Sequence, residues 1–116
     1  MRKDKGRDSM KIFFDTEFTG LHKDTTLISI GLVSEDGRQF YAELTDYDLE
    51  QCNDWIEKNV LENLITYRDD NFEKANYIPN LHVGDKQDIS KSLKNWFKQF
   101  DFVELVSDVS HYDFVL

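Results

Sequence analysis

The sequence predicts an α/β fold in which a mixed β-sheet is flanked by helices. Three observations lead to this prediction. Short apolar runs separated by turn residues occupy the N-terminal third, and two later segments repeat apolar residues at helical spacing. A further apolar run follows the second of these segments. A three-stranded antiparallel meander that crosses through helices to a fourth strand would place that strand parallel to the first.

The strands of the meander are predicted over three stretches. Residues 11–16 contain the continuous apolar run Ile-Phe-Phe, which is typical of a central strand buried on both faces. Residues 26–34 are rich in β-branched side chains and form the second expected strand. Residues 35–38 include an Asp-Gly pair that indicates a hairpin turn, and 39–44 form the returning strand.

Helices are expected in the second half of the chain. Apolar residues at spacings of three to five predict a helix over 54–65, followed by a long loop over 67–84 that contains the only proline. A second helix is expected over 85–99, with its first residue, an aspartate, as the N-cap. The fourth strand is expected over 102–107, and 110–116 resemble the opening of another helix.

Composition indicates one small domain. The chain has 116 residues, of which 40% are hydrophobic and 14% aromatic. Residues 1–9 are polar and predict a disordered lead, so the folded domain is expected over 10–116. No stretch is apolar enough to cross a membrane or to form a secretory signal. The single cysteine, Cys52, favours a reducing, cytoplasmic location and no catalytic role.

The formal net charge of −9 argues against a polyanionic partner. Two observations weaken that argument. Some acidic residues can belong to a metal site, where bound cations reverse the local field. Basic residues are also grouped locally, at Lys91, Lys94 and Lys98. The acidity therefore lowers the expected affinity for nucleic acid without excluding a nuclease.

Asp15 and Glu17 are the candidate metal ligands. They stand two positions apart at the end of the first apolar strand, so their side chains are expected on the same face. Carboxylate oxygens are preferred ligands of Mg²⁺ and Mn²⁺, and a two-cation site can activate water and clamp a phosphate. Acidic residues are common at strand ends, however, and the pair alone leaves a structural role open.

The sequence around Asp15 and Glu17 resembles that of a known family. The run Ile-Phe-Phe-Asp-Thr-Glu-Phe-Thr-Gly-Leu over 12–21, followed by the strand over 26–34, resembles the first motif of the DEDD (DnaQ-like) 3′–5′ exonucleases. The run Trp-Ile-Glu-Lys-Asn-Val-Leu over 55–61 resembles a helix of the small bacterial and phage exoribonucleases related to ribonuclease T. The resemblance implies a ribonuclease H-like fold and hydrolysis of phosphodiesters by two-metal-ion catalysis. It also implies Mg²⁺ or Mn²⁺ as cofactor and single-stranded nucleic acid, RNA favoured, or a nucleotide as partner.

The resemblance also implies roles for individual residues. Asp15, Glu17 and Asp113 would be catalytic metal ligands, and Glu17 would also orient the attacking water. Asp113 lies in the run His-Tyr-Asp-Phe-Val-Leu and is the best match to the second family motif, with Asp108 as the competing acid. Capping of the last expected helix is the structural alternative for both aspartates.

Three further residues are expected at the substrate. The backbone around Phe18 and Thr19 would face the sugar of the terminal nucleotide, and Leu21 would lie beside its base. An ordinary core position remains an equal alternative for Leu21. The family's third motif, a Tyr or His followed by an Asp on a last helix, has no match here, so the domain is expected to be C-terminally incomplete.

A chain that lacks the third motif is expected to be a poor nuclease alone, because it lacks a metal ligand and a general base. The alternative is a non-catalytic, exonuclease-like binding or regulatory module. A third, weaker alternative is a homodimer, because an incomplete sheet would leave an edge and an apolar face open to a second copy.

Overall fold

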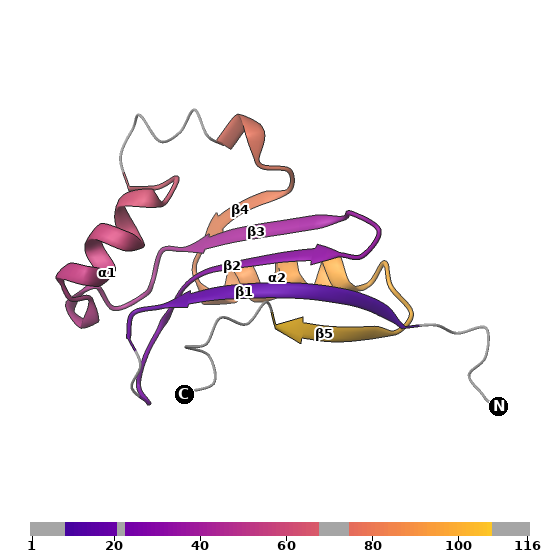
Figure 1. Cartoon of the computed structure of the whole chain (residues 1–116), viewed down its shortest axis with the longest axis horizontal. Coiled ribbons are helices and arrows are strands. Elements are labelled where there is room, and N and C mark those ends of the chain that lie inside the picture. Colours follow the sequence, from indigo (N-terminus) through magenta and orange to yellow (C-terminus); the bar gives the residue numbers. More distant parts are fainter. Residues whose placement is uncertain (1–8, 21–22, 68–74, 108–116) are drawn as a thin grey trace.

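A computed structural model of the chain describes residues 9–20, 23–67 and 75–107. It shows a five-stranded mixed sheet in the order β4-β3-β2-β1-β5, with α2 behind it and α1 beside one end (Figure 1). The strands are β1 Met10–Phe18, β2 Leu27–Ser34, β3 Gln39–Leu44, β4 Leu81–Gly84 and β5 Val103–Ser107. The helices are α1 Asp54–Asn59 and α2 Lys86–Phe97, with 3-10 turns η2 at Leu49–Gln51 and η3 at Leu61–Asn63.

The predicted meander and its parallel addition are confirmed. The prediction that the first strand is buried on both faces is wrong, because Ile12 on one face is 0% exposed whereas Phe13 on the other is 37% exposed. Strands β1, β2 and β3 pair antiparallel in sequence order. Strand β5 pairs parallel to β1, with Met10 opposite Val103 and Phe14 opposite Ser107. The helices between β3 and β5 supply the crossover that a parallel pairing requires.

The prediction of a loop over 67–84 is wrong at its C-terminal end, where Leu81–Gly84 form strand β4. This strand pairs parallel to β3, with Tyr41 opposite Leu81. Asn80, at a positive φ of 56°, turns the chain into the strand, and its side-chain amide donates to the carbonyl of Gln39 at 2.9 Å. A strand this short gives too little alternation to be recognised in sequence. Because β4 precedes it in the chain, the strand predicted over 102–107 is the fifth strand, β5, rather than the fourth.

The helix expected over 54–65 is also shorter than predicted. It starts as its sequence suggests, since Asn53 Oδ1 accepts a hydrogen bond from the amide of Ile56 at 2.8 Å. It ends at Asn59, and a 3-10 turn follows. The amides of Ile65 and Thr66 donate to the carboxylate of Glu43 instead of to carbonyls four residues back. A side-chain acceptor from the sheet has therefore replaced the helical pattern.

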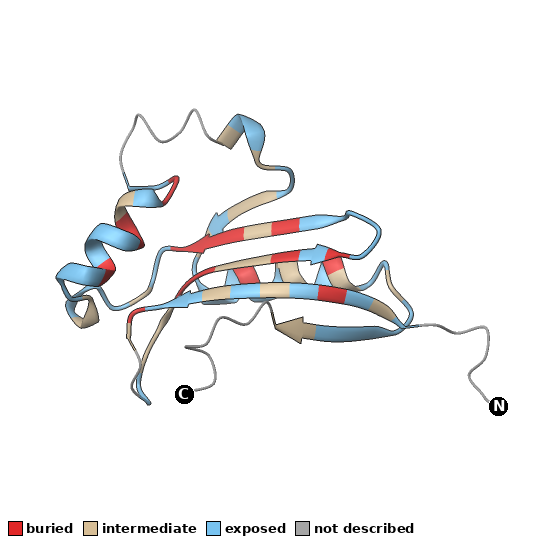
Figure 2. Ribbon diagram, viewed as in Figure 1, coloured by how far each residue is buried: buried red, intermediate tan, exposed pale blue. Residues whose placement is uncertain are grey.

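Helix α2 begins where the sequence predicts and covers one face of the sheet. Asp85 caps it, with Oδ1 accepting from the amide of Asp88 at 2.8 Å. The helix ends at Phe97, two residues earlier than expected. Figure 2 shows the buried positions of the sheet concentrated on β2 and β3, whereas β5 has none. The main core between α2 and the sheet contains Ile12, Leu32, Phe40, Ala42, Leu44, Ile89 and Trp96.

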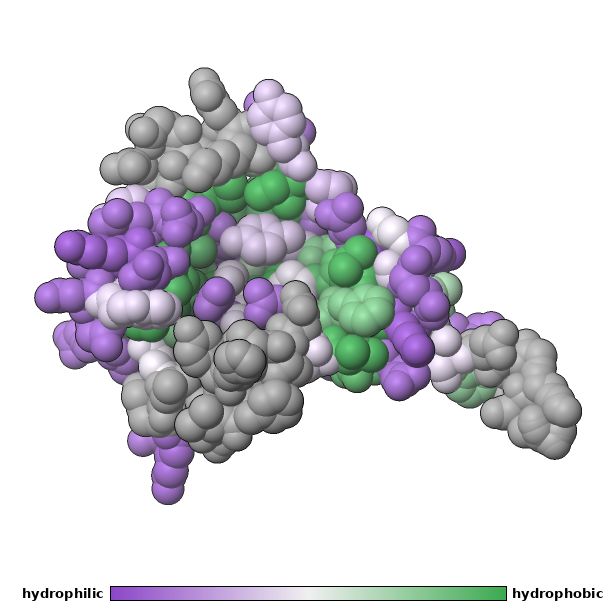
Figure 3. All heavy atoms as spheres, viewed as in Figure 1, coloured by the Kyte–Doolittle hydropathy of each residue, from purple (hydrophilic) through white to green (hydrophobic). Residues whose placement is uncertain are grey.

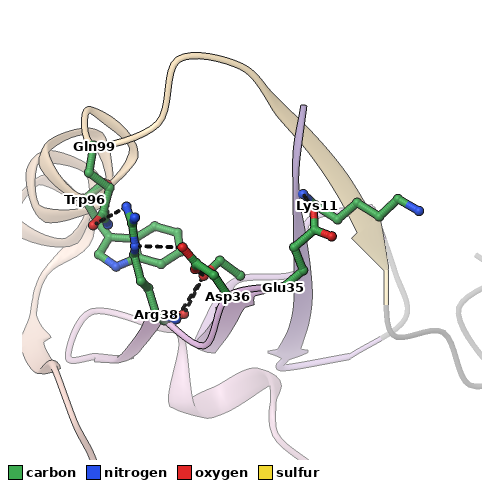
Figure 4. A network of polar contacts seen from close by, with 7 residues as sticks. Lys11, Glu35, Asp36, Arg38, Trp96 and Gln99 are labelled. Atoms are coloured by element: carbon green, nitrogen blue, oxygen red, sulfur yellow. Dashed lines mark hydrogen bonds and ion pairs between the residues drawn. The ribbon is translucent and has the colours of Figure 1, made fainter. Parts of the chain in front are cut away.

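The turn between β2 and β3 is tied to the neighbouring elements by polar contacts (Figure 4). Arg38 pairs with Asp36 at 3.1 Å and donates to Gln99, just beyond α2, at 3.1 Å. The amide of Lys11 on β1 donates to the Glu35 carboxylate at 2.8 Å. These contacts fix the end of the sheet that lies away from Asp15.

Two expectations fall largely outside the described residues, namely the disordered lead over 1–9 and the helix over 110–116. Within the described part of the chain, no helix has the length and apolar character needed to cross a membrane.

Candidate functional site

Asp15 and Glu17 lie on β1 with their side chains on the same face of the sheet, as the two-residue spacing predicts. Both are exposed. The alternate residues Ile12 and Phe14 pack into the core under α2, so the carboxylates belong to the opposite, open face. In Figure 1 this open face is turned toward the reader, because α2 lies behind the sheet.

Cross-strand pairing surrounds the two acids with defined neighbours. Asp15 lies opposite Gly31 on β2, which lies opposite Tyr41 on β3. In the next row on this face, Glu17 lies opposite Ser29, which lies opposite Glu43. A Cβ on Gly31 would lie 3.7 Å from Tyr41 Cδ1, an ordinary contact, so the ring of Tyr41 lies directly beside the glycine.

A cleft of about 370 Å³ opens over these two rows. Its floor is the sheet, at Asp15, Glu17, Ser29, Gly31 and Tyr41. Its opposite side, here called the cleft wall, is formed by Asn59, Val60, Asn63 and Leu64 from the end of α1 and the η3 turn. The carboxylates thus border a space large enough for a small ligand.

A second cavity of about 330 Å³ continues from the first, since both are lined by Asp15, Gly31 and Tyr41. Its lining is mainly apolar and includes Phe13, Val33 and Ile78 among its residues. Figure 3 shows apolar side chains gathered over the middle of this face, beside hydrophilic ones. Neither cavity has a lysine or arginine among its described lining residues.

Glu43 is a residue that the sequence analysis missed. Its side chain is fully buried, and its carboxylate accepts four hydrogen bonds. Oε2 accepts from the Tyr41 hydroxyl at 2.7 Å and the Ile65 amide at 2.8 Å. Oε1 accepts from the Thr66 amide at 3.0 Å and the Thr66 hydroxyl at 2.8 Å. No local signal marks this glutamate, because two of its partners lie more than twenty residues away along the chain.

Tyr41 connects this buried acid to the open cleft. Burial raises the pKa of its phenol above the ordinary value, and the hydrogen bond to Glu43 and the charges of Glu43 and Glu17 raise it further. A hydrogen bond with Ser29 acts in the opposite direction. The phenol therefore stays protonated and acts as a donor toward Glu43 at neutral pH.

Thr19, expected near the substrate, has a buried side chain within a threonine cluster. Its hydroxyl donates to Gln51 Oε1 at 2.6 Å and accepts from the amide of Thr26 at 3.0 Å. Its own amide donates to the carbonyl of Thr26 at 2.9 Å. These contacts fix the chain just after β1.

The remaining expected site residues are only partly described. Phe18 is 36% exposed and ends β1 at an irregularity in the pairing with β2. Leu21, Asp113 and the competing Asp108 lie outside the described residues. The structure therefore brings Asp15 and Glu17 together and leaves the third expected ligand unplaced.

The described donor set fits one part of a metal site. Asp15 and Glu17 are exposed carboxylates on one face, a suitable pair of ligands for a hard divalent cation. Glu43 lies in the same row, but its oxygens are already occupied by four donors. Among residues 9–20, 23–67 and 75–107, no group of three Asp, Glu, His or Cys side chains could hold a metal ion.

The chain is similar to two curated proteins of Mycobacterium tuberculosis, from strains CDC 1551 and H37Rv, each named a 3′–5′ exoribonuclease. Both are 46% identical to it over 55 residues, which are 47% of this chain. The matched stretch spans 33% of the length of each relative. No protein-family model matches the chain.

Proposed function

We propose that this chain contributes the metal-binding face of a 3′–5′ exoribonuclease. The observation that carries the proposal is the position of Asp15 and Glu17, which share the open face of β1 and line the floor of a cleft. The names of the two similar mycobacterial proteins support the reaction class. The proposal extends to a DEDD-type active site on a ribonuclease H-like fold, with which the mixed five-stranded sheet is compatible.

In this proposal, Asp15 and Glu17 hold Mg²⁺ or Mn²⁺ together with Asp113. When bound, the cations would polarise the scissile phosphate and acidify the attacking water. Glu17 would orient that water, while the open cleft beside it admits the end of a nucleic-acid strand. The terminal sugar would lie near the backbone of Phe18 and Thr19, and the base near Leu21.

RNA is the favoured substrate, and it would have to be single-stranded to enter a cleft of about 370 Å³. The described cleft has no basic side chain, and the chain is acidic overall. Phosphate binding would therefore depend on the cations at Asp15 and Glu17 more than on lysine or arginine. The proposal places the reaction in the cytoplasm, on the single-cysteine composition alone.

The nuclease assay uses 3′-labelled and 5′-labelled single-stranded RNA and DNA oligomers with Mn²⁺. We expect slow, EDTA-sensitive shortening of RNA from the 3′ end, because the sequence has no match to the family's third motif, which supplies a further metal ligand and a general base. Asp15→Asn should remove this activity, whereas Asp101→Asn, an exposed aspartate beyond α2, should retain it. Equal digestion by wild type and Asp15→Asn would contradict the assignment.

A non-catalytic binding or regulatory module is the second candidate. It is favoured by the absence, among the described residues, of a three-ligand metal cluster. Binding of single-stranded RNA or a nucleotide without any cleavage would support this candidate. Self-association through the exposed apolar residues of the open face, such as Phe13 and Val33, would be compatible with either function.

A further inference from the structure

Glu43 occupies an unusual position for a carboxylate. It stands in the same cross-strand row as Glu17, with Ser29 between them, yet Glu17 is exposed and Glu43 is 0% exposed. A buried carboxylate is costly unless donors satisfy its oxygens. Both oxygens of Glu43 are satisfied, each by two donors.

The donors come from two different parts of the molecule. Tyr41 belongs to the sheet and lines both cavities. Ile65 and Thr66 directly follow Leu64, the last residue of the cleft wall. The carboxylate of Glu43 is therefore a bridge between the floor of the cleft and its wall, made of hydrogen bonds between 2.7 and 3.0 Å.

The cleft wall carries two asparagines, Asn59 and Asn63, among the residues that line the cleft. The side-chain amide nitrogen of Asn59 donates to the carbonyl of Trp55 at 2.9 Å. That of Asn63 donates to the carbonyl of Asn59 at 3.1 Å. Each of these bonds uses one of the two hydrogens of an NH₂ group, so each asparagine side chain still has a second N–H donor and an oxygen acceptor. Such amide groups match the hydroxyl, N–H and carbonyl groups of a sugar or base.

We propose that Glu43 is a positioning residue, which holds the cleft wall with Asn59 and Asn63 at a fixed distance from Asp15 and Glu17. The sugar or base of a bound nucleotide then lies on the wall while its phosphate lies toward the acids. This inference rests on the proposed function, because it assumes that the cleft binds a nucleotide. It assigns a role in nucleotide binding to a residue that contacts neither the cation nor the substrate.

The isosteric change Glu43→Gln tests the bridge. Each oxygen of Glu43 receives two donors, so an amide group must point its NH₂ at a pair of N–H or O–H donors in either orientation. The wall should detach from the sheet while Asp15 and Glu17 keep their places on β1. Glu57→Gln, an exposed glutamate of α1, is the matched control.

The measurement is isothermal titration calorimetry with Mn²⁺ alone, and with uridine 5′-monophosphate in the presence of Mn²⁺. We expect Glu43→Gln to raise the Kd for the nucleotide about tenfold and to leave the Kd for Mn²⁺ within about twofold of wild type. If the role of Glu43 were only structural, Glu43→Gln would lower the melting temperature but leave the Kd for the nucleotide unchanged at temperatures where the variant is folded. Glu57→Gln should match wild type in both titrations.

Thr66→Val and Thr66→Ser provide a second pair if Glu43→Gln does not fold. Valine removes the hydroxyl that donates to Glu43 at 2.8 Å, whereas serine retains it. Only the valine variant should weaken nucleotide binding. If the wild type binds both ligands and the glutamine or valine variant binds them equally well, the inference is overturned. If the wild type binds neither ligand, the proposed function falls, and the inference with it.

Discussion

The two faces of the sheet differ sharply, although the same strands form both. On the closed face, toward α2, Ile12 and Phe40 are almost completely buried, and Trp96 of the helix packs on the Phe40 ring at a centroid distance of 6.0 Å. On the open face, Phe13 is 37% exposed, and the neighbouring positions carry acids, a glycine and a tyrosine. Adjacent residues of one strand thus serve different purposes.

The closed face therefore mainly stabilises the fold, whereas the open face carries the candidate site. Apolar burial under α2 supplies the main stabilisation, because it removes large side chains from water. The open face contributes less burial and leaves Asp15 and Glu17 accessible to ligands. Glu43 on this face is fully buried and connects the cleft wall to the sheet. Substitutions on the two faces should therefore have separable effects.

The largest effect is expected from Phe40→Ala on the closed face. The ring is 1% exposed and also stacks on His82 at 4.6 Å. Its removal should lower the free energy of unfolding by about 3–5 kcal/mol, a large part of the total for a domain of this size. Urea denaturation followed by circular dichroism measures the change.

Phe13→Ala is the matched substitution on the open face. We expect a loss of less than about 1 kcal/mol in the same experiment, because much of this ring is already in contact with water. Equal losses for Phe13→Ala and Phe40→Ala would mean that the open face is covered in solution, for example by a second copy.

A smaller effect is expected at high pH, through Tyr41. Its pKa in the folded state is raised above the unfolded value of about 10. The contribution of Tyr41 to folding stability is therefore fully present at pH values below the unfolded pKa. It is lost as the pH rises toward the folded pKa, because in this range only the unfolded state releases the proton. Urea titrations at pH values from about 8 to 11 should show this decline.

Tyr41→Phe should flatten the decline, since phenylalanine has no proton to lose. Tyr77→Phe is the control, because this tyrosine is 84% exposed, and it should leave the slope unchanged. Some slope should remain in Tyr41→Phe, since burial also raises the pKa of Tyr47. An unchanged slope in Tyr41→Phe would contradict the rise in the pKa of Tyr41 that burial and the hydrogen bond to Glu43 cause.

Local pattern was sufficient to predict much of the fold. The apolar run of β1, the β-branched residues of β2 and the Asp-Gly turn before β3 predicted strands that are confirmed, as are the Asp85 cap and the parallel placement of β5. The segment around β4 was predicted as a loop, because Leu81–Gly84 is too short for a clear period and its pairing with β3 is a long-range choice. The end of α1 was misjudged for a similar reason, since Glu43 on a distant strand takes the amides of Ile65 and Thr66.

The candidate site was predictable only in its local part. Asp15 and Glu17 follow from strand alternation and resemblance, and the structure places them on one face of β1. Tyr41, Glu43 and the cleft wall join them through pairing register and tertiary contacts that no spacing in the sequence reveals. The metal-binding role of Asp15, Glu17 and Asp113 and the substrate roles of Phe18, Thr19 and Leu21 stay predictions.

Thermal unfolding with and without Mn²⁺ tests the metal-binding claim most directly. A cation that binds only the folded chain adds about 2.7 kcal/mol to the free energy of unfolding when its free concentration is about 100 times its Kd. We predict a rise of several degrees in the melting temperature of wild type and of Asp101→Asn, and little or none in Asp15→Asn. A wild type that does not respond to Mn²⁺, or an Asp15→Asn variant that responds equally, would contradict the assignment of a metal site to the open face.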